Sequence, residues 1–131
     1  PWNDTEFDSA RYRILGLDYD LLKQSVDVFS PMVYHERMGR NPDWVAENIQ
    51  WFNNKLGIKG NEYPKVWPIV QAYNNPGVVS AKDFEKVMFG GLSAGSTGIM
   101  MFTTYAVAED EEKTQVMKKI YMDLINGHID Q

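Results

Sequence analysis

The sequence lacks several features that mark common classes of protein. It has no cysteine, which excludes disulfide bonds, thiolate catalysis and cysteine-ligated metals. It has no stretch of about 18 consecutive apolar residues, so we expect no membrane span. Histidine is scarce, and because His128 lies in the C-terminal tail, a two-histidine metal site with His35 is not expected. We therefore predict no metal and no other cofactor.

The chain also lacks a basic cluster and a targeting signal. A net charge of −5 with no compensating basic patch argues against nucleic acid as a partner. The first residues do not have the charged-then-apolar layout of a signal peptide. The chain starts at Pro1 without an initiator methionine, which suggests a processed or excised piece of a longer protein. With 131 residues, of which 44% are hydrophobic, it has the size of one globular domain, residues 1–131.

A repeated pattern of apolar runs and amphipathic helices is the main positive feature. The runs, predicted as strands, cover residues 26–34, 65–72 and 98–104, and helical patterns follow at 43–56, 81–92 and 111–125. A short helix at 18–25 precedes the first run. Units of this kind predict an α/β fold with parallel strands, whose chemistry lies at the carboxyl ends of the strands. Pro68 cannot donate to a strand ladder, so we expect either a bulge there or pairing that begins after it.

Polar residues at the helix starts support these boundaries. Asn41 followed by Pro42 is a typical N-cap and first helical residue, and Ser80 with Asp83 resembles a capping box. Either Glu109 or Asp110 is expected to cap the last helix.

Three parallel strands would leave two long edges open to further pairing. One interpretation is therefore that the chain is about three strands of a (β/α)8 barrel, a fold that needs roughly 200 residues or more. The alternative is a small doubly wound domain with an additional strand at residues 12–17.

A family resemblance favours the barrel. Residues 30–35 (SPMVYH), preceded by Asp27, resemble the sixth-strand region of bacterial glycoside hydrolases with a (β/α)8 barrel, which are distant relatives of the family 18 chitinase-like clan. Met32 and Tyr34 match the first and third positions of that clan's Met-x-Tyr-Asp motif, and His35 stands where the clan carries Asp. The similarity extends over residues 14–125, and its other segments are 42–45 (PDWV), 67–72 (WPIVQA) and 91–102 (GLSAGSTGIMMF).

The resemblance implies that this chain is the C-terminal part of such an enzyme. In the clan the general acid lies on the fourth strand, in an Asp-x-x-Asp-x-Asp-x-Glu motif that this sequence does not contain. The principal catalytic acid would then lie outside this chain, so the resemblance alone does not make the chain an enzyme. It implies a carbohydrate as partner, together with the rest of the barrel or self-association, and slightly favours a secreted or cell-envelope location.

Five residues near the predicted strand ends are candidates for a sugar site. Tyr34 would support catalysis by hydrogen bonding to substrate or to charge near the anomeric carbon, and the alternative is a packed core tyrosine. Gln71 would bind a sugar hydroxyl, and Phe102, where chitinase-like enzymes often place Trp, would stack under a sugar ring. His35 and Glu36 would also contact substrate. His35 is equally consistent with fixing its loop, whereas a surface-loop acid is the favoured interpretation of Glu36.

Two functions follow from these residues. The first is a glycoside hydrolase segment that contributes Tyr34, His35, Gln71 and Phe102 to sugar binding. The second is a non-catalytic α/β domain that binds a sugar or another protein through the same strand-end surface or an exposed sheet edge.

Overall fold

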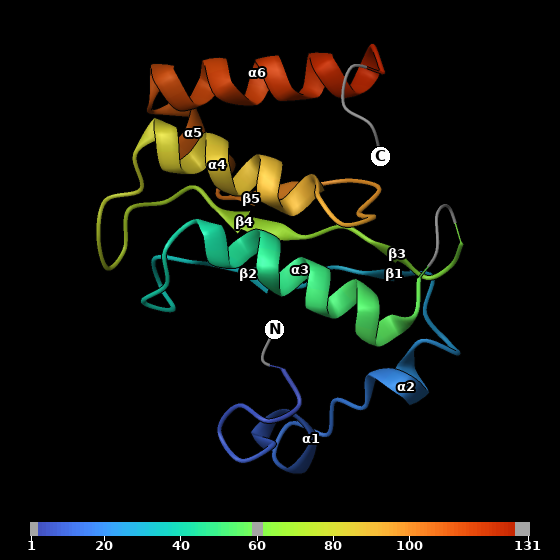
Figure 1. Cartoon of the computed structure of the whole chain (residues 1–131). Helices are drawn as coiled ribbons and strands as arrows, with labels where there is room; N and C mark the ends of the chain where they lie inside the picture. Colours follow the sequence, from blue (N-terminus) through green and yellow to red (C-terminus); the bar gives the residue numbers. More distant parts are fainter. Residues whose placement is uncertain (1–2, 59–61, 128–131) are drawn as a thin grey trace.

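Parallel strands lie at the centre of the computed structural model, which describes residues 3–58 and 62–127 (Figure 1). The first predicted strand forms β1 (Val28–Phe29) and β2 (Met32–Val33), the second forms β3 (Lys65–Val66) and β4 (Ile69–Gln71), and the third forms β5 (Met100–Phe102). β1 pairs with β3 in one small sheet, and β2, β4 and β5 pair in that order in a second, all in parallel. The predicted α/β class with parallel strands is confirmed.

Proline explains why two of the predicted strands are each divided in two. Pro31 and Pro68 have no N–H to donate, so the ladder is interrupted at both. Their carbonyls still accept hydrogen bonds from the next strand, at 2.9 Å from Ile69 N to Pro31 O and 2.9 Å from Met100 N to Pro68 O. Pairing therefore resumes directly after each proline, and it also occurs before Pro68, between β1 and β3.

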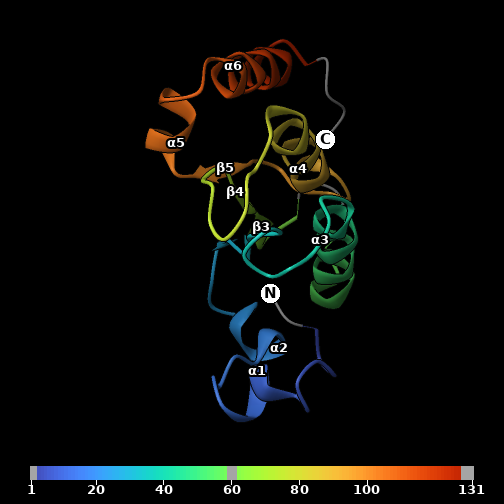
Figure 2. The same cartoon turned by 90° about the vertical axis from the view of Figure 1, so that its left-hand side faces the viewer.

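Helices cover one face of the strands. α3 (Asp43–Leu56) and α4 (Ala81–Leu92) contact each other and lie to one side of the strands, and α6 (Glu111–Ile125) packs along α4 (Figures 1 and 2). These helices occupy the residues at which the apolar periodicity predicts them. Most of their buried side chains and those of the strands form the main core, which includes Val33, Val45, Ile49, Val70, Phe84, Val87, Met88 and Ile120. A second cluster contains Tyr19, Phe52, Leu56 and Val66.

Side-chain caps fix where these helices begin. Asn41 Oδ1 accepts a hydrogen bond from Trp44 N at 3.1 Å, and Ser80 Oγ accepts from Asp83 N at 3.0 Å. Asp110, one of the two predicted caps of the last helix, accepts from Lys113 N at 3.1 Å. Each bond satisfies an amide that has no partner inside its helix.

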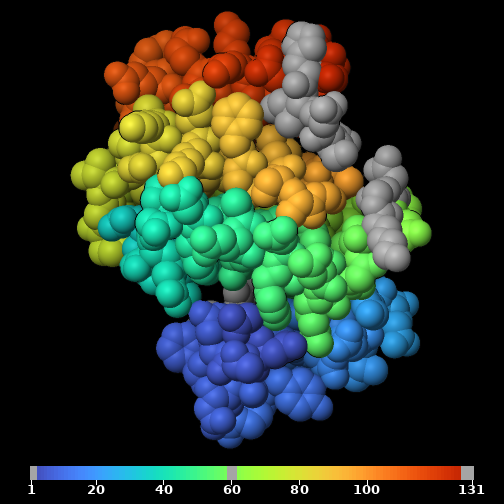
Figure 3. All heavy atoms as spheres, in the orientation of Figure 1, coloured from blue at the N-terminus to red at the C-terminus, as the bar shows by residue number. Residues whose placement is uncertain are grey.

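The N-terminal residues form a lobe at one end of the molecule (Figure 3). It contains α1 (Ala10–Arg13) and α2 (Tyr19–Leu22), so the helix predicted at 18–25 is shorter than expected. Residues 12–17 contain the end of α1 and a turn, and the additional strand considered there is wrong. A further short helix that periodicity did not predict, α5 (Thr104–Ala108), follows β5. No helix in the described ranges has the length and apolar character needed to cross a membrane.

The second face of the strands carries exposed apolar side chains. The register pairs Met32 with Ile69 and Ile69 with Met100, so these side chains share a face, and Val33 and Val70 share the helix-covered face. Met32 is 62% exposed, whereas Val33 beside it is completely buried. The exposed face also carries Trp67 and Phe102, and Trp67 lies so close to Gly98 that a side chain at this glycine would collide with it.

Adjacent substitutions in β2 test this assignment of faces. We expect Val33→Ala to lower the free energy of unfolding by about 2 kcal/mol, because it leaves a cavity in the core. Met32→Ala is expected to cost less than about 0.5 kcal/mol, because its side chain is exposed. Urea unfolding followed by circular dichroism measures both. Equal losses would contradict the assignment of an open face.

Candidate functional site

Three aromatic rings meet at the carboxyl ends of β2, β4 and β5. Tyr34 and Tyr73 follow β2 and β4, and Phe102 ends β5. The ring centroids are 5.9 Å apart in each of the three pairs, and Tyr34 is stacked on Phe102 with an interplanar angle of 23°. Parallel pairing brings these strand ends to one edge, so residues 34, 73 and 102 become neighbours. We call Tyr34, Tyr73 and Phe102 the aromatic cluster.

The aromatic cluster remains accessible and keeps hydrogen-bonding capacity. Phe102 is 50% exposed. Within residues 3–58 and 62–127 the Tyr34 hydroxyl has no hydrogen-bond partner. Partial burial, and to a smaller extent the neighbouring Tyr73, raises the pKa of Tyr34 above its ordinary value, so its hydroxyl is protonated at neutral pH. It can therefore donate to and accept from a ligand.

Gln71 ends β4 opposite Phe102 in the strand register and is completely buried. Its amide nitrogen donates to the carbonyls of Tyr73 at 3.0 Å and Asn75 at 2.9 Å, and its amide oxygen accepts from Arg37 N at 3.0 Å. One amide thus joins the loop after β2 to the loop after β4. Its described contacts are with these loops, and the predicted sugar contact stays a prediction.

His35 is buried in the loop that follows β2. Its carbonyl accepts hydrogen bonds from the amides of Met38 and Arg40, which closes the loop. Burial lowers the pKa of the imidazole below its ordinary value of 6.5, and the nearby Asp83 and Glu36 oppose this shift. The imidazole is therefore neutral at pH 7.

Glu36 contacts the loop after β4. Its carboxylate lies against Gly77, where a Cβ atom would collide with Glu36 Oε1. Glu36 thus packs on this loop and is not part of the aromatic cluster. No group of three or more residues suited to hold a metal ion occurs in the described part of the chain, and His128 lies outside it.

A buried lysine that sequence reasoning missed lies at the same edge. The Lys113 ammonium on α6 donates to the Ala72 carbonyl at 2.9 Å and to Asn74 Oδ1 at 3.3 Å, and lies 3.7 Å from Asp110 Oδ2. Its side chain is 1% exposed. The available signal was helical spacing, since Lys113 precedes Met117, Ile120 and Leu124 on one stripe. A charged side chain on the buried stripe of a helix is stable only where hydrogen-bond acceptors surround it.

Two pockets flank the aromatic cluster. The polar pocket, of about 470 Å³, adjoins Tyr73 and is also lined by Asn74, Thr103, Tyr105, Ala106, Glu109, Asp110 and Lys113. The apolar pocket, of about 330 Å³, adjoins Tyr34 and is also lined by Arg11, Leu15, Leu17, Tyr19, Met32, Arg37, Met38 and Trp44. Of the candidate site residues, Tyr34 and Phe102 are therefore brought together beside these pockets, whereas His35, Gln71 and Glu36 support the surrounding loops.

Comparison of this chain with models of protein families, with curated proteins and with solved structures finds no match. The functional interpretation therefore depends on the geometry of this edge of the sheet.

Removing the charge of Lys113 tests its role in holding the end of β4. We expect Lys113→Met to lower the free energy of unfolding by about 1–3 kcal/mol, because the Ala72 carbonyl loses its buried ammonium donor. Lys118→Met, at an exposed position of the same helix, should change it by less than about 0.5 kcal/mol. Urea titration of both variants gives the comparison. Equal effects would remove the proposed role of the Lys113 ammonium.

His35 predicts a specific dependence of stability on pH. Its folded-state pKa lies below 6.5, so the unfolded chain binds the proton first as the pH falls. We therefore expect the free energy of unfolding to fall from about pH 6.5 downward through the folded-state pKa, and this group to have no effect above that window. In urea titrations at several pH values, His35→Gln should lose less stability on acidification than the unmodified chain. Parallel curves for the two proteins would show that His35 contributes nothing to the pH dependence.

Proposed function

We propose that this chain forms part of a (β/α)8 glycoside hydrolase barrel and supplies sugar-binding residues at the carboxyl ends of its strands. The three predicted strand segments pair side by side in chain order, as in a barrel wall. The long helices α3 and α4 lie on one side of the strands (Figure 2). The other face carries the exposed Met32 and Phe102. A doubly wound sheet has helices on both faces, and a barrel has them outside only. In the proposed barrel the exposed face turns inward.

The aromatic cluster is the single observation that carries the sugar-binding part of the proposal. Sugar rings have apolar C–H faces that pack on aromatic rings and hydroxyl groups that need polar partners. Phe102 offers an exposed ring face, and Tyr34 offers both a ring and a hydroxyl without a described partner. In turnover, the Tyr34 hydroxyl would stabilise charge that develops near the anomeric carbon.

The acids near this edge favour a binding role for the chain, with the principal acid in another part of the barrel. Glycoside cleavage normally needs two carboxyl groups that flank the scissile bond. Glu36 lies against Gly77, and Glu109 accepts a hydrogen bond from Tyr105, which raises the pKa of that phenol. Because neither belongs to the aromatic cluster, we assign the principal acid to residues that complete the barrel.

The same observation favours a second candidate function, a non-catalytic domain that binds sugar through the aromatic cluster. Both candidates require sugar binding, and only the first requires turnover once the barrel is complete. An assay on aryl glycosides, with and without the residues that complete the barrel, separates them.

Sugar binding is tested by titrating the full chain with a panel of oligosaccharides and following ¹H–¹⁵N shifts by NMR. We expect at least one sugar to shift signals of residues 34, 73 and 102. Tyr34→Phe should weaken its binding about 2- to 10-fold through the lost hydroxyl, and Phe102→Ala by up to about 10-fold through the lost ring contact.

Matched controls lie away from this edge. Tyr63→Phe removes an exposed hydroxyl in the loop before β3, and Phe89→Ala removes a partly exposed ring on α4. Both should leave the affinity within twofold of the unmodified chain, about 0.4 kcal/mol. Absence of binding across the panel, or equal losses in the controls, would refute the sugar site.

A further inference from the structure

The apolar pocket beside Tyr34 has the size and lining of a small-molecule site. Its volume of about 330 Å³ lies within the range of ligand pockets. One wall comes from the N-terminal lobe, with Leu15 and Leu17, and the opposite wall comes from Met32, Met38 and Trp44.

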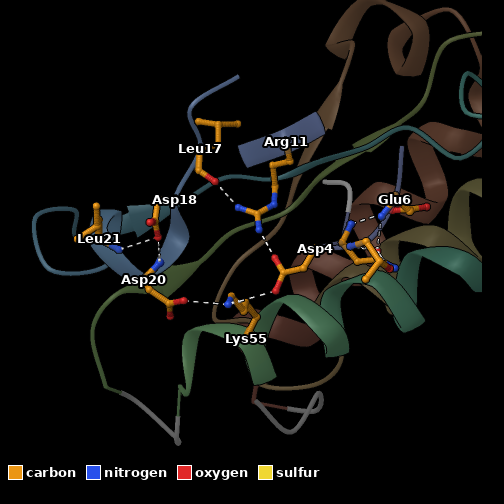
Figure 4. A network of polar contacts seen from close by, with 10 residues as sticks. Asp4, Glu6, Arg11, Leu17, Asp18, Asp20, Leu21 and Lys55 are labelled. Carbon is orange, nitrogen blue, oxygen red and sulfur yellow. Dashed lines mark hydrogen bonds and ion pairs between the residues drawn. The ribbon is translucent and has the colours of Figure 1, made fainter. Parts of the chain in front are cut away.

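Ion pairs fix the N-terminal wall in place (Figure 4). The Arg11 guanidinium donates to the Leu17 carbonyl and pairs with Asp4. Asp4 in turn pairs with Lys55 of α3 at 3.2 Å, and Lys55 pairs with Asp20 at 2.8 Å. The pocket is therefore built between two connected parts of the fold.

The polar groups of the pocket are donors, and none of its lining residues is acidic. The Arg37 guanidinium forms no ion pair or hydrogen bond with residues 3–58 or 62–127, whereas Arg40 in the same loop pairs with Glu6 at 3.2 Å. Arg11 is 5% exposed, and its Nε has no hydrogen-bond partner in the described part of the chain. The Tyr34 hydroxyl is a third group without such a partner. Of these three groups only Arg11 is buried, and a buried donor normally has an acceptor, whereas Arg37 is exposed and Tyr34 is half-buried.

We propose that this pocket binds a small molecule with an apolar body and a carboxylate group, such as an aryl-alkyl carboxylate. The leucine, methionine and tryptophan side chains contact the body. The carboxylate accepts hydrogen bonds from Arg37 and the Tyr34 hydroxyl, and Arg11, whose charge is compensated by Asp4, lines the same pocket with an unpartnered Nε. This proposal does not rest on the proposed sugar function: the pocket is lined by neither Tyr73 nor Phe102, and the two proposed sites share only the Tyr34 hydroxyl.

A pair of nearly isosteric probes tests the proposal, 4-phenylbutyrate and its uncharged amide. Each is titrated into the full chain while the Trp44 indole N–H is followed by ¹H–¹⁵N NMR, with the Trp67 indole as a reference outside the pocket. We expect both probes to shift the Trp44 signal and the carboxylate to bind about fivefold more tightly, because its hydrogen bonds are charge-assisted.

Variants then identify the groups responsible. Arg37→Gln should reduce the preference for the carboxylate to less than twofold, or about 0.4 kcal/mol, and the matched Arg40→Gln should retain it. Met38→Asp adds a negative charge to the wall and should abolish detectable carboxylate binding, whereas Met122→Asp, exposed on α6, should not. Circular dichroism checks that each variant is folded.

Three results would overturn the proposal. They are no Trp44 shift with either probe, equal affinity for acid and amide, or a preference that Arg37→Gln leaves unchanged. Sugar binding at the aromatic cluster is measured separately, so failure here leaves that proposal standing.

Discussion

Parallel pairing of three chain segments is the constraint on which the rest of the structure depends. Val33 and Val70 reach the helix-covered face only because β2 and β4 pair in this register, and a shift by one residue would exchange the two faces. The same register brings residue 71 opposite residue 102. The buried core and the candidate site therefore both depend on this strand register. Pro31 and Pro68 are compatible with this pairing although they have no N–H to donate. Their carbonyls still accept hydrogen bonds from the neighbouring strand, which continues the pairing past each proline.

The parts of the fold that were predicted from sequence are those with a clear periodicity. α3, α4 and α6 each have apolar side chains at helical spacing over three or more turns, which fixes both their existence and their limits. α1 and α5 have 4 and 5 residues, too few for such a pattern to develop. Of the two breaks, only the one at Pro68 is expected from the sequence, as a bulge or as pairing that begins after it. The structure instead pairs the segment on both sides of Pro68.

For the candidate site, sequence reasoning located the right edge of the sheet but not every role. Tyr34 and Phe102 were expected near each other because parallel strands end together, and the structure places them in contact. For Gln71, residue spacing in the sequence does not predict the hydrogen-bond partners of the side chain. Its position at a strand end was clear, but which acceptors would reach its amide depended on how two loops fold over it. Lys113 was missed for the same reason, since its acceptors at residues 72 and 74 are remote in sequence.

At this edge of the sheet a polar pocket and an apolar pocket lie on either side of the aromatic cluster, and they suit different ligands. Gln71 and Lys113 satisfy the backbone groups behind the aromatic cluster, so the rings face solvent on a rigid support. Tyr34 borders the apolar pocket and Tyr73 borders the polar one, so the cluster forms the boundary between them. The Tyr73 side offers acids, an amide and hydroxyls to a ligand with hydroxyl groups. A ligand with an apolar body and negative charge is best satisfied on the Tyr34 side, where the charged groups are arginines.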